Sequence, residues 1–168
     1  IMGPVFEPEI NKKGKAEDMV MVSPDVGGVV RARALAKRLG CGLAIIDKRR
    51  EKAGVSEVMN VIGNVDGKIC FLVDDIVDSG GTLCNAAIAL KGKGAKEVHA
   101  YAVHGVLSGG AVARVSSSEL ESLVITDSIA ATEAVRVSDS IEQISLAPLL
   151  GEAIKRISEE KSISELFK

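Results

Sequence analysis

The sequence predicts an α/β fold whose mainly parallel sheet is flanked by helices. Short aliphatic runs alternate with segments of helical spacing along most of the chain, which is the order of elements in such folds. Hydrophobic residues make up 46% of the 168 residues, but aromatic residues only 2%. The core is therefore expected to consist of Val, Ile, Leu and Ala, as in a parallel sheet that helices cover on both faces.

The N-terminal segment differs from the rest of the chain. Residues 1–18 are polar, carry Pro4 and Pro8 and show no clear hydrophobic period, which favours a linker or a segment entering from elsewhere. We therefore expect one domain at 19–168, in a chain that is part of a longer protein. In order, the runs and periods predict a strand at 19–22, a helix at 29–39, strands at 43–46 and 55–62, a strand at 68–73 and a helix at 83–90.

The second half continues this alternation up to a C-terminal helix. It is expected to contain a strand at 97–103, a short helix at 111–116, a strand at 123–126 and edge strands at 135–137 and 143–146. The last helix is expected at 148–159, because Pro148 suits a first turn. Its apolar side would be formed by Leu149, Ile154 and Ile157.

Charge and cysteine content limit the partners and the compartment of the protein. The formal net charge of −2 gives no electrostatic case for nucleic acid. No apolar run reaches membrane length and the first residues lack the pattern of a signal peptide, so no membrane partner is expected. Cys41, Cys70 and Cys84 have no metal-ligand spacing and lie in apolar or helical surroundings, which favours buried thiols and a cytoplasmic location.

The most informative stretch is Phe-Leu-Val-Asp-Asp-Ile-Val-Asp-Ser-Gly-Gly-Thr at 71–82. An apolar strand is followed by Asp74 and Asp75, and a glycine-rich turn at 78–82 leads into a helix. Glycines let backbone N–H groups approach a phosphate and a helix N-terminus attracts anions, so this junction predicts a phosphate cradle. The lysine of a Walker-type loop is missing, and phosphate beside carboxylates instead indicates a sugar phosphate whose hydroxyl groups the acids bind, with Mg²⁺ screening the charge. The alternative is an ordinary strand–turn–helix junction with acidic helix caps.

Two further loops carry groups suited to phosphate. The loop Ser23-Pro24-Asp25-Val26-Gly27-Gly28 repeats the combination of a carboxylate, two glycines and a helix start, with a plain helix cap as the alternative. The run Asp47-Lys48-Arg49-Arg50 places three cations in a row, which would neutralise a polyphosphate; the alternatives are a solvated loop and a nucleic-acid patch. Together the acidic, glycine-rich loops indicate two phosphate-bearing groups, or one phosphate and one pyrophosphate.

With these loops the chain resembles ribose-phosphate pyrophosphokinases, the enzymes that make phosphoribosyl pyrophosphate. The matching segments are Ser-Pro-Asp-Val-Gly-Gly-Val-Val-Arg-Ala-Arg at 23–33, Ile-Ile-Asp-Lys-Arg-Arg at 45–50, Ser-Glu-Val-Met-Asn-Val-Ile-Gly at 56–63, Val-Asp-Asp-Ile-Val-Asp-Ser-Gly-Gly-Thr-Leu at 73–83, His-Gly-Val-Leu-Ser-Gly at 104–109 and Ser-Ile-Ser-Glu-Leu-Phe at 162–167. The resemblance covers residues 19–168. Simple phosphoribosyltransferases share the 74–82 loop, which implies a fold like that of the type I phosphoribosyltransferases.

The resemblance also implies roles for individual residues. Ribose 5-phosphate would be bound by Arg50, Asp74, Asp78, Ser79, Gly80, Gly81 and Thr82. The pyrophosphate loop would consist of Asp25, Val26, Gly27 and Gly28, with Asp25 holding Mg²⁺, and the catalytic pair on a mobile loop would be Lys48 and Arg50. Ser162, Ser164 and Phe167 match an element of an allosteric nucleotide site between subunits, with a frayed amphipathic tail as the alternative.

The implied reaction moves a pyrophosphoryl group from ATP to the C1 hydroxyl of ribose 5-phosphate and releases AMP. The resemblance also implies a homo-oligomer, which would be a hexamer. Family members have a preceding domain that carries much of the adenine site and a metal-binding histidine. Nothing here matches it, so the chain is expected to be the C-terminal half of a two-domain enzyme, with low activity alone. His99 and His104 are interpreted as structural rather than as metal ligands. The alternative functions are a phosphoribosyltransferase and a non-catalytic regulatory relative.

Overall fold

The structure is a computed structural model that describes residues 3–49 and 58–167. Its strands are β1 (Met19–Ser23), β2 (Gly42–Arg49), β3 (Val58–Ile62), β4 (Ile69–Val77), β5 (Glu97–Gly105), β6 (Ser122–Thr126) and β7 (Ile141–Ile144). Its helices are α1 (Gly3–Asn11), α2 (Val29–Leu39), α3 (Gly81–Gly92), α4 (Ala111–Ser116), α5 (Glu133–Arg136) and α6 (Ala147–Ser158), with 3₁₀ turns at Ala16–Asp18 and Ser164–Phe167.

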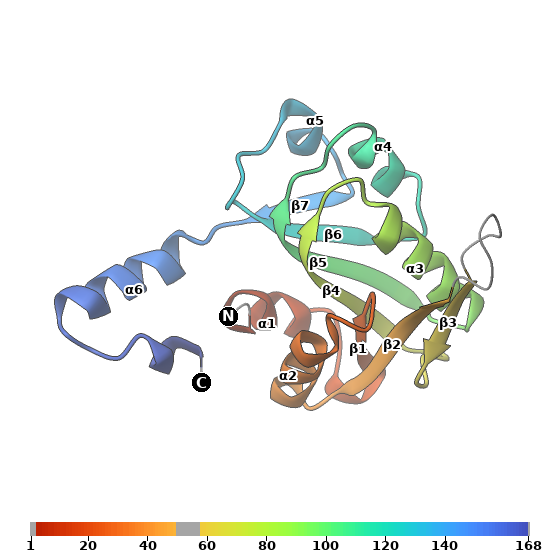
Figure 1. Cartoon of the computed structure of the whole chain (residues 1–168), viewed down its shortest axis with the longest axis horizontal. Coiled ribbons are helices and arrows are strands. Elements are labelled where there is room, and N and C mark those ends of the chain that lie inside the picture. The colour runs from red at the N-terminus through yellow and green to blue at the C-terminus, as the bar shows by residue number, and fades with distance from the viewer. Residues whose placement is uncertain (1–2, 50–57, 168) are drawn as a thin grey trace.

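The seven strands of this part of the chain form one sheet in the order β3-β2-β1-β4-β5-β6-β7 (Figure 1). Neighbouring strands are parallel except β2 and β3, which are antiparallel. The chain moves outward in opposite directions from β1 and from β4, so the loops after these two central strands lie side by side at the carboxyl ends of the strands. The predicted fold with a mainly parallel sheet flanked by helices is confirmed.

Helices cover both faces of the sheet, and β4 shows how the strand residues divide between them. Phe71 and Val73 belong to the hydrophobic cluster that packs under α1 and α2. Cys70 and Leu72 belong to the cluster under α3 and α4, on the other face. This alternation is the period of two expected of a strand, and both faces are apolar because both are buried.

The segment expected to be a linker contains a packed helix instead. In α1, Phe6 and Ile10 are fully buried, and the Phe6 ring meets Tyr101 of β5 edge-on with 5.2 Å between ring centroids. Two apolar residues four positions apart are enough to attach one helical turn to the sheet. They are too few to show a hydrophobic period beside two prolines, which explains why the pattern did not predict this helix.

One expected edge strand is wrong and another is shifted. Residues expected as a strand at 135–137 lie largely in α5, which Thr132 caps by accepting a hydrogen bond from the Val135 N–H at 3.4 Å. The cap satisfies a helix N–H, and this local chemistry outweighs the β-branched side chains nearby. The last strand, expected at 143–146, is β7 and begins at Ile141.

Three strands extend further than expected, which changes the setting of several charged residues. Strand β2 continues to Arg49, so Lys48 lies in the strand and pairs with Met59 rather than standing in a loop. Strand β4 continues to Val77, so Asp74 and Asp75 lie within its last residues and not beyond its end. Strand β5 ends at Gly105 and includes His104.

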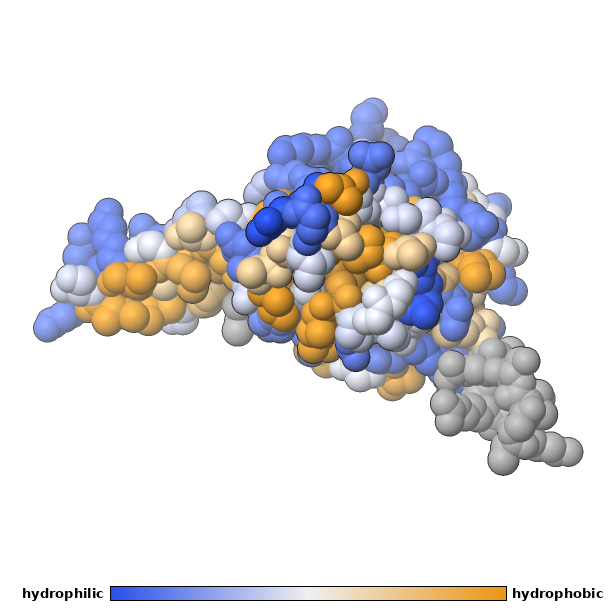
Figure 2. Space-filling view, turned by 90° about the horizontal axis from the view of Figure 1, so that it is seen from above, coloured by the Kyte–Doolittle hydropathy of each residue, from blue (hydrophilic) through white to orange (hydrophobic). Residues whose placement is uncertain are grey.

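Helix α6 extends away from the body of the molecule (Figure 1). None of its residues is buried, and Leu150, Ile154 and Ile157 on it are 55%, 68% and 61% exposed. Figure 2 shows hydrophobic side chains gathered along this arm. The apolar side expected for this helix is present, but the described residues do not cover it.

Candidate active site

The turn between β4 and α3 leaves a helix N-terminus open to a small pocket. Gly80 is the residue before the helix and has a left-handed conformation (φ +75°, ψ −8°). No side chain caps α3, so Asp78 does not act as the acidic helix cap that was the alternative interpretation. A pocket of about 190 Å³ lies against this turn, and its polar lining includes Asp74, Asp78, Ser79 and Thr82. We call the loop 78–82 the phosphate loop and this space the phosphate pocket, because uncapped N–H groups at a helix start form an anion site.

The carbonyl groups of the phosphate loop bond to the protein. Ser108 N–H donates to Asp78 O at 3.2 Å, and Cys84 N–H donates to Gly80 O at 3.0 Å. The Arg114 guanidinium of α4 donates to Ser79 O. With three successive carbonyls held in this way, the N–H groups of the loop are the polar backbone groups left for a ligand. Sequence reasoning missed Arg114, because it lies 35 residues from Ser79 in a short helix without a motif.

Asp74 and Asp75, which we call the acidic pair, stand beside the phosphate loop and contact one arginine. Arg31 of α2 places Nη1 3.0 Å from Asp75 Oδ2 and Nη2 3.5 Å from Asp74 Oδ1. Asp74 Oδ1 also accepts a hydrogen bond from the Asp75 N–H at 2.9 Å. Burial raises the pKa of Asp74, and the Asp75 carboxyl raises it further, while that backbone hydrogen bond and the Arg31 charge lower it. Carboxylates held in this way can accept hydrogen bonds from sugar hydroxyl groups.

The loop 23–28, here called the first loop, is closed by its own side chains. Ser23 Oγ donates to Asp25 O at 2.6 Å, and Asp25 Oδ1 accepts the Gly28 N–H at 2.8 Å. A Cβ on Gly28 would lie 2.7 Å from Ser23 Oγ, so only glycine fits this close approach. Asp25 thus bonds the N–H of Gly28, the residue before α2, but Gly28 has no side chain to cap the helix, so the N-terminus of α2 itself has no side-chain cap.

The structure places Lys48 in β2, which β1 separates from β4, the strand that carries the acidic pair. At Lys48 the strand pairs with Met59 of β3, whereas its pairing with β1 covers residues 42–45. Arg50, the other member of the expected catalytic pair, lies outside the described residues.

The expected allosteric residues divide into two groups. Phe167 lines a pocket of about 140 Å³ together with Phe6, Arg31 and Asp74, and its carbonyl accepts a hydrogen bond from Arg38 of α2 at 3.3 Å. Ser162 and Ser164 bond to each other through their hydroxyl groups at 2.8 Å and do not line that pocket. The fold therefore brings only the phenylalanine towards the acidic pair.

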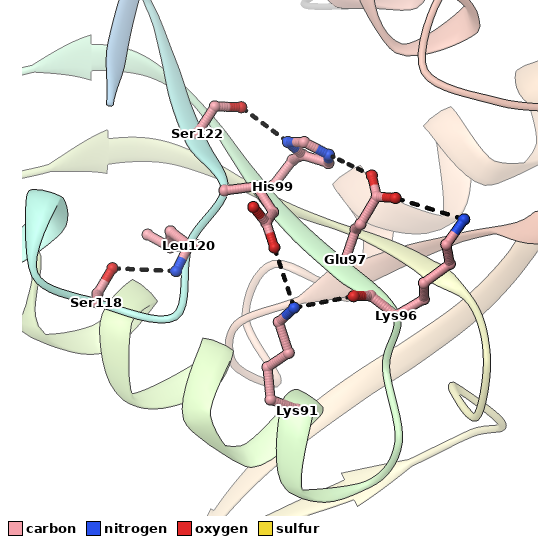
Figure 3. A network of polar contacts seen from close by, with 8 residues as sticks. Lys91, Lys96, Glu97, His99, Ser118, Leu120 and Ser122 are labelled. Atoms are coloured by element: carbon pink, nitrogen blue, oxygen red, sulfur yellow. Dashed lines mark hydrogen bonds and ion pairs between the residues drawn. The ribbon is translucent and has the colours of Figure 1, made fainter. Parts of the chain in front are cut away.

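The two histidines lie at opposite ends of β5. His104, at the carboxyl end, lines a pocket of about 540 Å³ together with Arg31 and Asp75, and its Nδ1 is 2.9 Å from Ser128 Oγ. His99 is buried at the other end in a polar network (Figure 3), with Nδ1 2.8 Å from Ser122 Oγ and Nε2 3.4 Å from Glu97. Its ring stacks on Phe71 at 5.5 Å.

Comparison with known proteins agrees with this geometry. The family model of the phosphoribosyl synthetase-associated domain matches residues 51–168. The chain belongs to this family. It is 61% identical over 164 residues to a ribose-phosphate pyrophosphokinase of Granulibacter bethesdensis and 63% identical to one of Rhizobium meliloti, in each case over 98% of this chain and 53% of the relative. The chain thus spans about half the length of these relatives, and the resemblance expected from its motifs is confirmed.

Solved structures support the same assignment. The phosphoribosylpyrophosphate synthetase of Mycobacterium smegmatis is 36% identical and superposes with a TM-score of 0.84 over 95% of this chain and 51% of that protein. An adenine phosphoribosyltransferase of Trypanosoma brucei, 16% identical, superposes with a TM-score of 0.55 over 86% of this chain and 63% of that protein. The second match shows the fold alone, and it confirms the expected likeness to phosphoribosyltransferases.

Proposed function

We propose that the protein to which this chain belongs is a ribose-phosphate diphosphokinase. It would transfer a pyrophosphoryl group from ATP to the C1 hydroxyl of ribose 5-phosphate, giving phosphoribosyl pyrophosphate and AMP. The observation that carries the proposal is the uncapped N-terminus of α3, which opens into a pocket that Asp74 also lines. Relatives that bear the name ribose-phosphate pyrophosphokinase support it, and they do not favour a phosphoribosyltransferase or a regulatory relative.

The proposed roles follow the chemistry of each loop. N–H groups of the phosphate loop bind the 5-phosphate, and the Ser79 and Thr82 hydroxyl groups donate further hydrogen bonds to it. The Asp78 carboxylate in the same pocket accepts hydrogen bonds from ribose hydroxyl groups. Asp74 accepts hydrogen bonds from ribose hydroxyl groups. The first loop receives the pyrophosphoryl group, and Lys48 with Arg50 neutralises charge on its oxygens. Phosphoryl transfer depends mainly on such alignment and neutralisation.

Mg²⁺ is proposed to act at the first loop, where Asp25 is suited to contact it. The Gly28 N–H occupies Asp25 Oδ1 at 2.8 Å, so Oδ2 is the oxygen that can face a cation. Within residues 3–49 and 58–167, no three ligating side chains form a metal cluster. One carboxylate fits a Mg²⁺ that is held mostly by substrate phosphates and water, which is the usual arrangement for this ion in phosphate chemistry. When bound, the ion would neutralise charge on the transferred group.

The assembly and location of the protein are also proposals. Further copies of the chain, in a hexamer by family resemblance, would provide partners for the exposed apolar side of α6. A cytoplasmic location is supported by Cys41, Cys70 and Cys84, which are free thiols. None of the helices in the described part combines the length and hydrophobicity needed to cross a membrane. Absence of a nucleic-acid partner and the allosteric role of Ser162, Ser164 and Phe167 stay predictions.

Calorimetric titration of the 168-residue chain with ribose 5-phosphate tests the site. Asp78→Asn removes one charge from the phosphate pocket, and we expect the affinity to fall by about tenfold or more, the usual effect of losing a charged hydrogen-bond partner. Asp139→Asn removes the same charge from an exposed residue before β7 and serves as the matched control. Unchanged affinity in Asp78→Asn, or no binding by the wild type, would contradict the assignment of this pocket.

A further inference from the structure

Arg31 joins two parts of the site that lie far apart in the sequence. It lies in the first turn of α2, directly after the first loop, and contacts Asp74 43 residues later. A Cβ built on Gly28 would lie 3.7 Å from Arg31 Nη2, so the guanidinium also stands next to the first loop. The same side chain lines the 540 Å³ pocket with Asp75 and the 140 Å³ pocket with Asp74.

The contacts of the guanidinium show what holds it there. Each of its Nη atoms faces a different carboxylate, Nη1 that of Asp75 and Nη2 that of Asp74. Its Nε is buried and has no hydrogen-bond partner among the described residues. An unpaired buried N–H costs stability. The guanidinium is therefore held in place by its two carboxylate contacts, although not all of its N–H groups have a hydrogen-bond partner.

We propose that Arg31 is a positioning residue of the sugar-phosphate site, which fixes the orientation of the Asp74 and Asp75 carboxyl groups beside the first loop and keeps Asp74 in its charged form. This inference rests on the proposed function and extends it to a residue on another element. A charged carboxylate accepts hydrogen bonds at both oxygens and donates none, which suits it to bind ribose hydroxyl groups.

Two adjacent carboxylates need such a cation. Burial and the neighbouring carboxyl of Asp75 favour the neutral form of Asp74, and the charge of Arg31 opposes both. Other charged or titratable groups line the surrounding pockets or the first loop: Asp25, Asp78, Arg38 and His104. Among them Arg38 is bonded to Glu7, at 3.0 and 2.8 Å, so the charge that contacts the pair directly is that of Arg31.

Three variants separate charge from geometry. Arg31→Gln removes the cation but keeps a polar side chain, and Arg31→Lys keeps the charge without the planar fork that reaches two carboxylates. Arg33→Gln removes the same charge from an exposed residue of the same helix, which has no ion pair with a residue that the structure describes. Comparison of the unfolding midpoints shows which variants fold. If Arg31→Gln does not fold, Arg31→Lys is used for the test in its place.

The first readout needs no ligand. In a ¹³C NMR titration of the aspartate carboxyl groups, we expect the midpoint of Asp74 to move to higher pH in Arg31→Gln. It should stay at the wild-type value in Arg33→Gln. Arg31→Lys should give a midpoint near that of the wild type. An unchanged midpoint in Arg31→Gln would overturn the inference.

The second readout is the pH dependence of ribose 5-phosphate binding, measured by calorimetry from about pH 5 to about pH 8, where carboxyl groups with raised pKa values titrate. For Arg31→Gln we expect binding about tenfold weaker or more at the acidic end and a smaller loss at the basic end. For Arg31→Lys we expect weaker binding with the pH dependence of the wild type. Equal weakening by Arg31→Gln at every pH would indicate a structural role and overturn the inference. Absence of wild-type binding would refute the proposed function, while the NMR readout would still decide the role of Arg31.

Discussion

Replacing Gly80 by alanine tests whether the backbone of the phosphate loop is specifically required. Gly80 has φ +75°, a conformation that costs other L-residues about 1–2 kcal/mol. The new Cβ would meet only Val115 Cγ2 at 3.5 Å and Ala111 O at 3.9 Å, which are ordinary contacts. No steric clash adds to the backbone term, so the free energy of unfolding should fall by about 1–2 kcal/mol.

The neighbouring glycine provides a matched control. Gly81 is the first residue of α3, has no positive φ and would place a Cβ 3.7 Å from Ser79 Oγ. Gly81→Ala should therefore stabilise the protein, by about 0.4–1 kcal/mol, because alanine reduces the freedom of the unfolded chain. The two variants add the same methyl group one residue apart, and they should change stability in opposite directions.

Thermal unfolding and ligand titration measure the two consequences. For a domain of this size, the Gly80→Ala midpoint should fall by roughly 2–8 °C, at about 2–4 °C per kcal/mol. Relief of the strain would also turn the loop N–H groups away from the phosphate, so ribose 5-phosphate should bind roughly 5–30-fold more weakly. If Gly80→Ala proved as stable as Gly81→Ala and bound the sugar phosphate equally well, the left-handed turn would not be the source of the site.

Three further perturbations test other parts of the molecule. Phe6→Ala should lower the free energy of unfolding by about 3–5 kcal/mol in denaturant titrations, because Phe6 is fully buried against the sheet; a loss below about 1 kcal/mol would mean that α1 is dispensable. Burial is the main cause that lowers the pKa of His99, so the unfolded chain binds a proton at this residue more readily than the folded chain does. The free energy of unfolding should therefore fall as the pH drops below about 6.5. His99→Gln should lose this pH dependence in unfolding measured at several pH values, and a slope equal to that of the wild type would contradict the prediction. In the full-length protein, Lys48→Ala should reduce kcat by about 10²–10³-fold with little change in KM, since its charge would act mainly in the transition state; wild-type turnover in steady-state kinetics would remove Lys48 from the catalytic pair.

Much of the fold was accessible from the sequence because its strong signals are local. The helix at 29–39 has the bounds of α2, and the short helix at 111–116 has the bounds of α4. Errors arose where local signals conflict or are short. Helix α1 is held by Phe6 and Ile10, whose importance depends on the sheet that they meet. Strands also extend beyond their predicted ends, because a charged residue such as Asp74 ends the apolar run in the sequence, whereas pairing with β5 continues to Val77.

In the candidate site, too, residues that are adjacent in the sequence can be predicted from it, whereas contacts between distant residues cannot. A turn such as 78–82 can be recognised because glycine, small polar residues and a helix start are adjacent, and the structure adds that no side chain closes it. Lys48 and the first loop are predicted in the same way, from compact runs of residues with suitable charge, and their roles stay predictions.

Arg31 and Arg114 could not be found by that reasoning, because each is an ordinary basic residue of a helix. Their importance comes from the strand order, which places the start of α2 and the segment after β5 beside the end of β4. Arg31 then reaches the acidic pair, and Arg114 reaches the Ser79 carbonyl. In the proposed site, a loop motif would thus supply the groups that face a ligand, while the residues proposed to fix their charge and direction come from elements that only the folded sheet brings near. Variants of such residues should alter the pH dependence or the geometry of binding, and this separates them from residues that touch the substrate.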